Sequence, residues 1–242
     1  MSDFLEKFEM PRRTMVLFFV IDTSGSMDGE KIGALNFAIK DAIPAVQEVS
    51  DENADAQIKI AALEFSSGAR WITANGPVEV EQFHWNNLYA EGVTDFGAAC
   101  KALNEKLSTK AFMQEATGSF APAIFLLSDG DPTDDWTKEL AELKKNNWFK
   151  AAVKVALAIG DDANLDVLKE FTGNMEAVLV THNAATLKRM IKFVSVTASK
   201  IASQSSNVGD NAGDLGEEAK QQQTIVAMKD YAQEADNDQK DW

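Results

Sequence analysis

The sequence predicts an α/β fold of the doubly wound type: a mainly parallel central sheet, helices on both of its faces, and one antiparallel edge strand. Short apolar segments of strand length alternate along the chain with longer segments that have the periodicity of amphipathic helices. Such alternation is typical of βαβ units, in which a helix crosses over between two parallel strands. The exception is the tight Ser66-Ser67-Gly68 segment between two strand-like runs, which predicts a hairpin and hence the antiparallel strand.

The first half of the chain contains three predicted strands and one helix. Residues 15–21 are continuously apolar and rich in β-formers, as in a strand that is buried on both faces. Residues 30–49 have helical spacing, and Pro44 should kink or shorten this helix. Residues 58–65 and 69–73 are the two strands that flank the hairpin turn.

The second half continues the alternation. Residues 95–110 place apolar side chains on one helical face, and residues 122–127 form another fully apolar strand. The pattern then predicts a helix at 136–147, a strand at 152–159, a short helix at 164–171, a strand at 177–180 and a helix at 184–202.

These elements form one body, for which we expect the boundaries 15–203, after an N-terminal extension at 1–14. Residues 204–242 contain nine acidic and three basic side chains and few core residues, which favours a flexible acidic tail. An alternative is a segment that docks on a partner, because residues 217–234 have weak helical character, with three roughly aligned apolar side chains, Ile225, Met228 and Tyr231.

The charge balance limits the partners. With 38 acidic and 23 basic residues the net charge is −15, so nucleic acid and anionic membranes are poor candidates. The single cysteine, Cys100, lies in an apolar helical pattern and is predicted to be a buried small hydrophobe. Without a disulfide framework, a signal peptide or an apolar run longer than residues 15–21, we expect a cytoplasmic protein.

Three polar loops are predicted to meet at one edge of the sheet. Asp22, Ser24 and Ser26 follow the first strand, Asp129 follows the strand at 122–127, and Thr94 precedes the helix at 95–110. Ligands of open parallel sheets bind at the carboxyl ends of the strands. A set of carboxylates and hydroxyls without histidine or cysteine favours magnesium, manganese or calcium, with a coordination position left for water or an outside carboxylate.

Each loop also has a simpler interpretation. Aspartate, serine and threonine before a helix often act as N-caps, which applies to Asp22, Ser24 and Thr94, and Asp129-Gly130 has the composition of a turn. The coincidence of all three loops at strand ends favours the metal site.

The motifs of these loops resemble those of the von Willebrand factor A domain. Residues 20–29 (VIDTSGSMDG) are similar to the first segment of its metal-ion-dependent adhesion site, residues 91–99 to the threonine segment and residues 126–130 to the distal aspartate segment. The resemblance covers residues 12–202 and implies a Rossmann-like fold. It also implies hydroxyl ligands from Ser24, Ser26 and Thr94, and direct or water-mediated binding by Asp22 and Asp129. Residues 159–165 resemble a further loop of the family, but Asp161 and Asp162 match no ligand position.

Within the family, two segments are similar to the soluble bacterial branch associated with tellurium resistance: residues 11–14 (PRRT) and residues 83–88 (FHWNNL). Members of this branch often belong with kinase-like and phosphatase-like proteins in stress or phage-defence settings. The resemblance therefore implies an adaptor in a phosphorylation system.

Enzymatic hypotheses fit the sequence less well than a metal-binding interaction module. An aspartyl phosphotransferase needs a second carboxylate two residues after Asp22, where Ser24 stands, and a lysine after the strand at 152–159. A phosphate-binding P-loop and a nucleophile elbow are absent from the sequence. The histidines, His84 and His182, are predicted to be structural or exposed.

We therefore predict a non-enzymatic module that binds a divalent metal and recognises a partner protein through an Asp or Glu carboxylate. The rivals are a metal-independent scaffold that uses the acidic tail, and a magnesium-dependent phosphotransferase. Three aromatic residues, Trp85, Tyr89 and Trp136, are candidates either for core packing or for the rim of the site.

Overall fold

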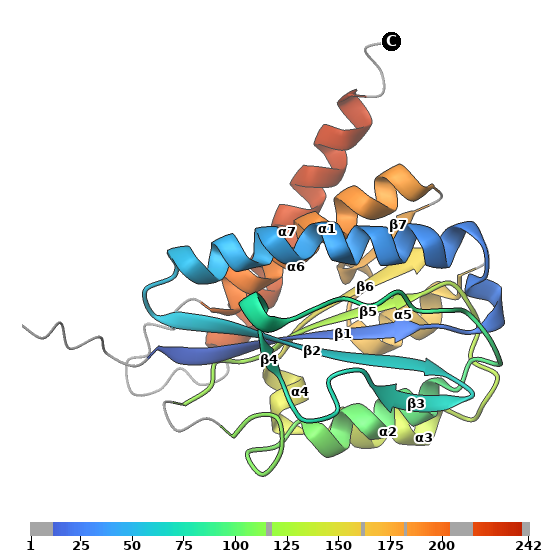
Figure 1. Ribbon diagram of the computed structural model, residues 1–242, viewed down its shortest axis with the longest axis horizontal. Helices are drawn as coiled ribbons and strands as arrows, with labels where there is room; N and C mark the ends of the chain where they lie inside the picture. The colour runs from blue at the N-terminus through green and yellow to red at the C-terminus, as the bar shows by residue number, and fades with distance from the viewer. Residues whose placement is uncertain (1–11, 115–117, 161–162, 182, 204–214, 239–242) are drawn as a thin grey trace, which may run out of the picture.

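The computed structural model describes residues 12–114, 118–160, 163–181, 183–203 and 215–238. A seven-stranded sheet runs through the molecule with helices above and below it, as Figure 1 shows. The predicted doubly wound α/β architecture is confirmed.

The strand order in the sheet is β3-β2-β1-β5-β6-β7, and all neighbours in this core are parallel except β3, which pairs antiparallel with β2. The predicted hairpin is present, with Ser66 opposite Gly68. The two-residue β4 also pairs antiparallel with β2, and it is too short for sequence periodicity to reveal. The strands are β1 (Arg13–Asp22), β2 (Ala56–Ser66), β3 (Gly68–Trp71), β4 (Val78–Glu79), β5 (Ala123–Ser128), β6 (Val153–Ile159) and β7 (Val178–Thr181).

Two hydrophobic cores lie on opposite faces of the sheet, because alternate residues of a strand point in opposite directions. In β1, Leu17 and Phe19 face the core under α1 and α6, whereas Val16 and Phe18 face the core under α2, α3, α4 and α5. The helices are α1 (Glu30–Glu52), α2 (Phe96–Lys106), α3 (Thr137–Leu143), α4 (Asn147–Ala151), α5 (Leu165–Thr172), α6 (Ala184–Ala202) and α7 (Leu215–Asp238), with short 3-10 turns at Gly25–Met27, Val80–Gln82 and Met175–Ala177.

Three helix boundaries differ from the prediction. Helix α1 continues past Pro44 to Glu52, so the expected shortening does not occur. A proline inside a helix destabilises it by about 3 kcal/mol, and the burial of Val46 and Val49 beyond Pro44 offsets this, because each contributes about 1.5–3 kcal/mol. Helix α2 ends at Lys106 instead of residue 110. The helix expected at 136–147 is two helices, because the Asn146 side chain accepts hydrogen bonds from the first backbone N–H groups of α4.

The acidic C-terminal segment departs furthest from the prediction of a flexible tail. Residues 215–238 form α7, in which Ile225 and Met228 are buried and Tyr231 stacks on Phe193 of α6 at 4.1 Å between ring centroids. The weak helical pattern seen in the sequence therefore marks a helix that packs on its own domain.

Helix α7 also completes the sheet edge at β6. Strand β7 pairs with β6 only from Ala156 onward. Before that point, the Gln221 side chain accepts from the backbone N–H of Lys154 and donates to its carbonyl oxygen, both at 2.8 Å. The amide group thus replaces the strand that β6 lacks there.

The predicted N-terminal extension, 1–14, lies mostly outside the described residues, and β1 begins at Arg13, within it. The tail residues 204–214 and 239–242 also lie outside. Within the described ranges, none of the helices combines the length and apolarity needed to cross a bilayer.

Candidate metal site

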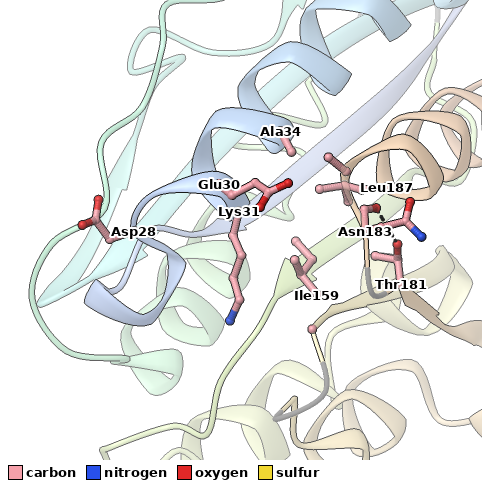
Figure 2. A pocket seen from close by; sticks show the side chains of 10 residues that line it. Asp28, Glu30, Lys31, Ala34, Ile159, Thr181, Asn183 and Leu187 are labelled. Carbon is pink, nitrogen blue, oxygen red and sulfur yellow. Dashed lines mark hydrogen bonds between the residues drawn. The ribbon is translucent and has the colours of Figure 1, made fainter.

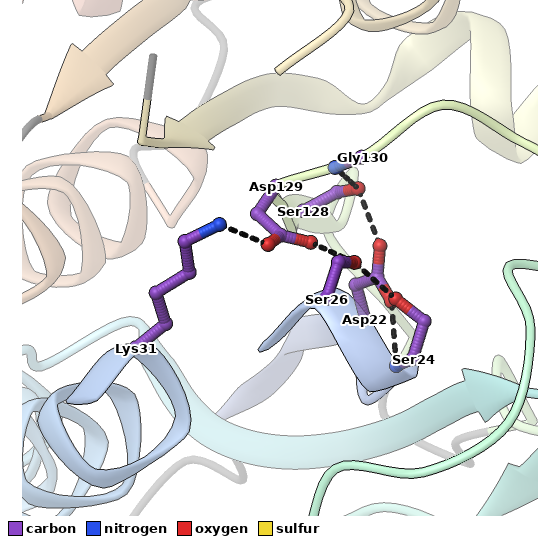
Figure 3. Close-up of polar contacts among 7 residues, drawn as sticks. All are labelled: Asp22, Ser24, Ser26, Lys31, Ser128, Asp129 and Gly130. Atoms are coloured by element: carbon purple, nitrogen blue, oxygen red, sulfur yellow. Dashed lines mark hydrogen bonds and ion pairs between the residues drawn. The ribbon is translucent and has the colours of Figure 1, made fainter. Parts of the chain in front are cut away.

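The candidate site lies where the sheet changes its winding direction. Strand β1 runs between β2 and β5, and Asp22 is its last residue. Asp129 directly follows Ser128, the last residue of β5. The carboxyl ends of these neighbouring parallel strands therefore place the two aspartates side by side, as Figure 3 shows.

Asp22 is buried and fixed by two hydrogen bonds. One of its carboxylate oxygens accepts from the backbone N–H of Ser24 at 2.9 Å, and the other accepts from the Ser128 hydroxyl at 2.6 Å. Burial raises the pKa of Asp22 above its ordinary value, although the hydrogen bonds from Ser128 and Ser24 oppose this rise. A buried carboxylate held in its ionised form is a costly group that a bound cation would stabilise.

A chain of hydroxyls connects the first loop to Asp129. The hydroxyls of Ser24 and Ser26 are 3.0 Å apart, and Ser26 donates to one oxygen of Asp129 at 2.8 Å. The other oxygen of Asp129 forms an ion pair with the Nζ of Lys31 from the first turn of α1 (Figure 3). Asp22, Ser24 and Asp129 are buried, whereas Ser26 is exposed, so the site opens to solvent on the Ser26 side.

Thr94 reaches the same point from the third loop. A Cβ atom added at Gly130 would lie 3.3 Å from the Ser26 hydroxyl and 3.8 Å from the Thr94 hydroxyl, so both oxygens surround the backbone just after Asp129. Asp95, not Thr94, caps α2, by accepting from the Ala98 N–H at 3.0 Å. The N-cap interpretation of Thr94 is therefore wrong, and its hydroxyl is available to the site.

Backbone hydrogen bonds hold the three loops in place. The N–H of Gly25 donates to the carbonyl of Gly92 at 3.1 Å, and the N–H of Glu91 donates to the carbonyl of Thr23 at 2.8 Å. The N–H of Thr133 donates to the carbonyl of Thr94 at 2.9 Å. Because these bonds join the loops directly to one another, the polar side chains are positioned before any ligand arrives.

The donor set fits a hard divalent cation. Of the two buried carboxylates, Asp129 pairs with the Lys31 ammonium group and Asp22 bonds only to Ser24 and Ser128 in the described contacts, which leaves a negative charge among convergent hydroxyl oxygens. In the described part of the chain, no three His, Cys, Asp or Glu side chains gather as a metal-binding group. An ion here would therefore draw ligands from hydroxyls and water as well as carboxylates, which suits magnesium or manganese better than zinc.

Two residues beside the site were not assigned a role from the sequence. Ser128 lies within the motif around Asp129, but its bond to Asp22 depends on the pairing of β1 with β5. Lys31 is two residues beyond the glycine-rich turn, and nothing in the local pattern shows that it faces Asp129.

The aromatic candidates divide between core and surface. Trp136 packs edge-on against Phe96, with 5.9 Å between the ring centroids. The indole N–H of Trp85 donates to the side-chain oxygen of Asn36 at 3.1 Å. Tyr89 is 82% exposed on the loop that leads to Thr94. His84 is exposed, as expected, whereas His182, Asp161 and Asp162 lie outside the described residues.

A pocket of about 390 Å³ opens next to the site, on the side of Lys31. Figure 2 shows Lys31 at one wall of this pocket, with Ile159 and Leu187 across from it. The candidate site is therefore adjoined by a pocket whose lining includes the apolar side chains of Ile159 and Leu187.

Fold and site together define a class of protein: a doubly wound α/β domain with an oxygen-lined, negatively charged site at the carboxyl edge of its sheet. The family model of the von Willebrand factor type A domain matches residues 17–193, and the chain belongs to this family. Members of the family are mostly adhesion or interaction modules. No curated protein matches the chain.

Several solved structures share the fold at low sequence identity. A von Willebrand factor type A protein from Catenulispora acidiphila is 18% identical, with a TM-score of 0.55 over 77% of this chain and 43% of its own. The pilus adhesin SpaC from Lactobacillus rhamnosus GG is 14% identical, with a TM-score of 0.62 over 80% and 31%. Proximal thread matrix protein 1 from the mussel byssus, with a zinc-occupied adhesion-site motif, is 16% identical, with a TM-score of 0.57 over 78% and 48%. The chain spans less than half the length of each.

Proposed function

We propose that this chain is a metal-dependent protein-interaction module and not an enzyme. Its ion, magnesium or alternatively manganese or calcium, would be held by Asp22, Ser24, Ser26, Thr94 and Asp129. The observation that supports this most strongly is the convergence of three loops, locked by backbone hydrogen bonds, on a pair of buried carboxylates, for which the described residues supply one cationic partner, Lys31 at Asp129.

The arrangement explains how a partner would be recognised. A bound divalent ion supplies a Lewis-acidic position that accepts an oxygen ligand from outside. Asp22 and Ser24 are buried, so they would hold the inner side of the ion, and exposed Ser26 marks the outer side. An Asp or Glu side chain of another protein is the natural ligand for that outer position, because carboxylate oxygens are preferred by hard cations.

The surface around the site suits protein contact. Tyr89 and Val93 are 82% and 52% exposed on the loop that carries Thr94. Exposed aromatic and aliphatic side chains next to a polar anchor are typical of interaction hot spots. Catalysis is less favoured, because among the described residues no histidine lies beside Ser24 or Ser26, and the Asp129 carboxylate that accepts from Ser26 is already paired with Lys31.

The cellular role is proposed from the resemblance of residues 11–14 and 83–88 to the tellurium-resistance branch. In that setting the chain would act in the cytoplasm as an adaptor in a stress-resistance or defence system, with a kinase-like or phosphatase-like partner. The net charge of −15 agrees with a protein partner and disfavours nucleic acid or membrane.

Calorimetry tests the metal site directly. Titration with magnesium and with manganese should show binding to the wild type, and Asp22→Ala or Asp129→Ala should abolish it. Partner capture from native cells with and without a chelator then tests recognition. Capture that survives both the chelator and Ser26→Ala would instead support a metal-independent scaffold that uses the acidic C-terminal segment.

A further inference from the structure

Lys31 occupies a specific position beside the candidate ligands. Its ammonium group forms an ion pair with the oxygen of Asp129 that does not accept from Ser26. The Asp129 side chain is fully buried and that of Lys31 is 32% exposed, so the lysine covers the carboxylate from the solvent side. Figure 3 shows the side chain extending from α1 to the far side of Asp129 from Asp22.

Gly160, at the end of β6, lies against the end of the Lys31 side chain. A Cβ atom at Gly160 would lie 3.2 Å from Cε of Lys31 and 3.3 Å from its Nζ, so a side chain at this position would crowd the end of the lysine. Gly160 has a φ of +95°, a conformation that other residues rarely adopt. The end of β6 is thus shaped to accommodate the ammonium group next to Asp129.

The positive charge of Lys31 affects both Asp129 and the binding of a metal ion. Asp22 and Asp129 are both buried, and among the described residues Lys31 is the cation that pairs with Asp129. A buried carboxylate without a counter-ion is strongly unfavourable, so Lys31 stabilises Asp129 whenever no other cation does. The same positive charge repels a divalent ion that binds across the carboxylate.

The geometry points to Lys31 as the residue that sets the affinity of the site: an internal counter-ion that holds Asp129 and competes electrostatically with the divalent metal. The inference rests on the proposed function, because it needs the same ion at the same site. Lys31 is therefore a positioning residue, which makes metal binding weaker and reversible while it keeps the loops assembled without metal.

The test is magnesium and manganese calorimetry on Lys31→Gln, which removes the charge but keeps an N–H donor for Asp129. It should bind either ion about tenfold more tightly than the wild type. Lys40→Gln, an exposed position on the same helix, is the matched control and should leave the affinity unchanged. Lys31→Arg retains the charge and should stay within about threefold of the wild type.

A second readout separates charge competition from a purely structural role. In chelator, Lys31→Gln should unfold at a lower urea concentration than the wild type, and added magnesium should restore its midpoint. If the variant is unfolded in chelator, recovery of its circular dichroism on adding magnesium supports the inference, and failure to recover overturns it.

The two proposals fail in different ways. Equal or weaker binding by Lys31→Gln, with a wild type that binds metal, overturns the role of Lys31 and leaves the metal site intact. Binding by Lys31→Gln alone supports the role of Lys31 and shows that the wild-type site is blocked by it. Absence of binding in both proteins overturns both proposals.

Discussion

Replacing Asp22 by asparagine should separate metal binding from folding. Asparagine has nearly the same shape and can keep the hydrogen bond from the Ser24 N–H, while the Ser128 hydroxyl turns to accept from the new amide. The substitution removes a fully buried charge whose pKa burial raises. We therefore expect the variant in chelator to be at least as stable as the wild type at neutral pH.

The pH dependence follows from the direction of that shift. A carboxyl group whose pKa is raised in the folded state binds its proton more tightly there than in the unfolded chain. Its contribution to stability is present below the ordinary aspartate pKa and is lost as the pH rises through the raised value. In chelator, the wild type should lose stability relative to Asp22→Asn over that window.

The size of the metal effect can be worked out from linkage. Metal at 100 times its dissociation constant stabilises a protein by about 2.7 kcal/mol. For a domain of this size, about 2–4 °C per kcal/mol gives a rise in Tm of about 5–10 °C. Thermal unfolding followed by circular dichroism, with chelator and with magnesium, should show this rise for the wild type and less than about 1 °C for Asp22→Asn. An equal rise in both proteins would refute the assignment of Asp22 as a ligand.

Three further outcomes follow from packing. Gln221→Ala should lower the free energy of unfolding in urea by about 1–3 kcal/mol, because it removes two hydrogen bonds to the backbone of β6, while exposed Gln223→Ala should be neutral. Equal effects would contradict the edge role of α7. Gly130→Ala should weaken magnesium binding in calorimetry, because its Cβ would lie 3.3 Å from the Ser26 hydroxyl, which is a crowded distance, whereas Gly33→Ala, with open space around it, should not. Unchanged affinity in both variants would argue against a site at this point. Burial raises the pKa of the Cys100 thiol, so a thiol reagent should label this residue only after unfolding. Rapid labelling of the folded protein would show that the core around α2 opens to solvent.

The sequence was most informative where one local pattern determines one element. The fully apolar run of β1 and the run ending in Ser128 identified the two central strands, because a short apolar run rich in β-formers is typical of a strand buried on both faces. The approach of Asp22, Ser24, Ser26 and Asp129 was also predictable, since the ends of neighbouring parallel strands share one edge of the sheet. Thr94 does not follow a strand directly and was expected beside them from the helix that starts after it. Their role as ligands stays a prediction.

What the sequence did not reveal depends on contacts between distant segments. The ion pair of Lys31 with Asp129 joins residues 98 positions apart, and the bonds of Gln221 to Lys154 join residues 67 positions apart. The amphipathic pattern of α7 is weak: Ile225, Met228 and Tyr231 are aligned, but nothing in the local sequence shows that they pack on their own domain and not on a partner. The split between α3 and α4 depends on one side chain, Asn146, which caps the second helix.

We propose that three separated loops offer their oxygen atoms to one divalent ion. A crystal soaked in manganese, measured for anomalous scattering, tests this most directly. We expect a single strong peak bounded by the hydroxyls of Ser24, Ser26 and Thr94 and the carboxylates of Asp22 and Asp129. A map with no peak there, at a manganese concentration that saturates the protein in solution, would contradict it.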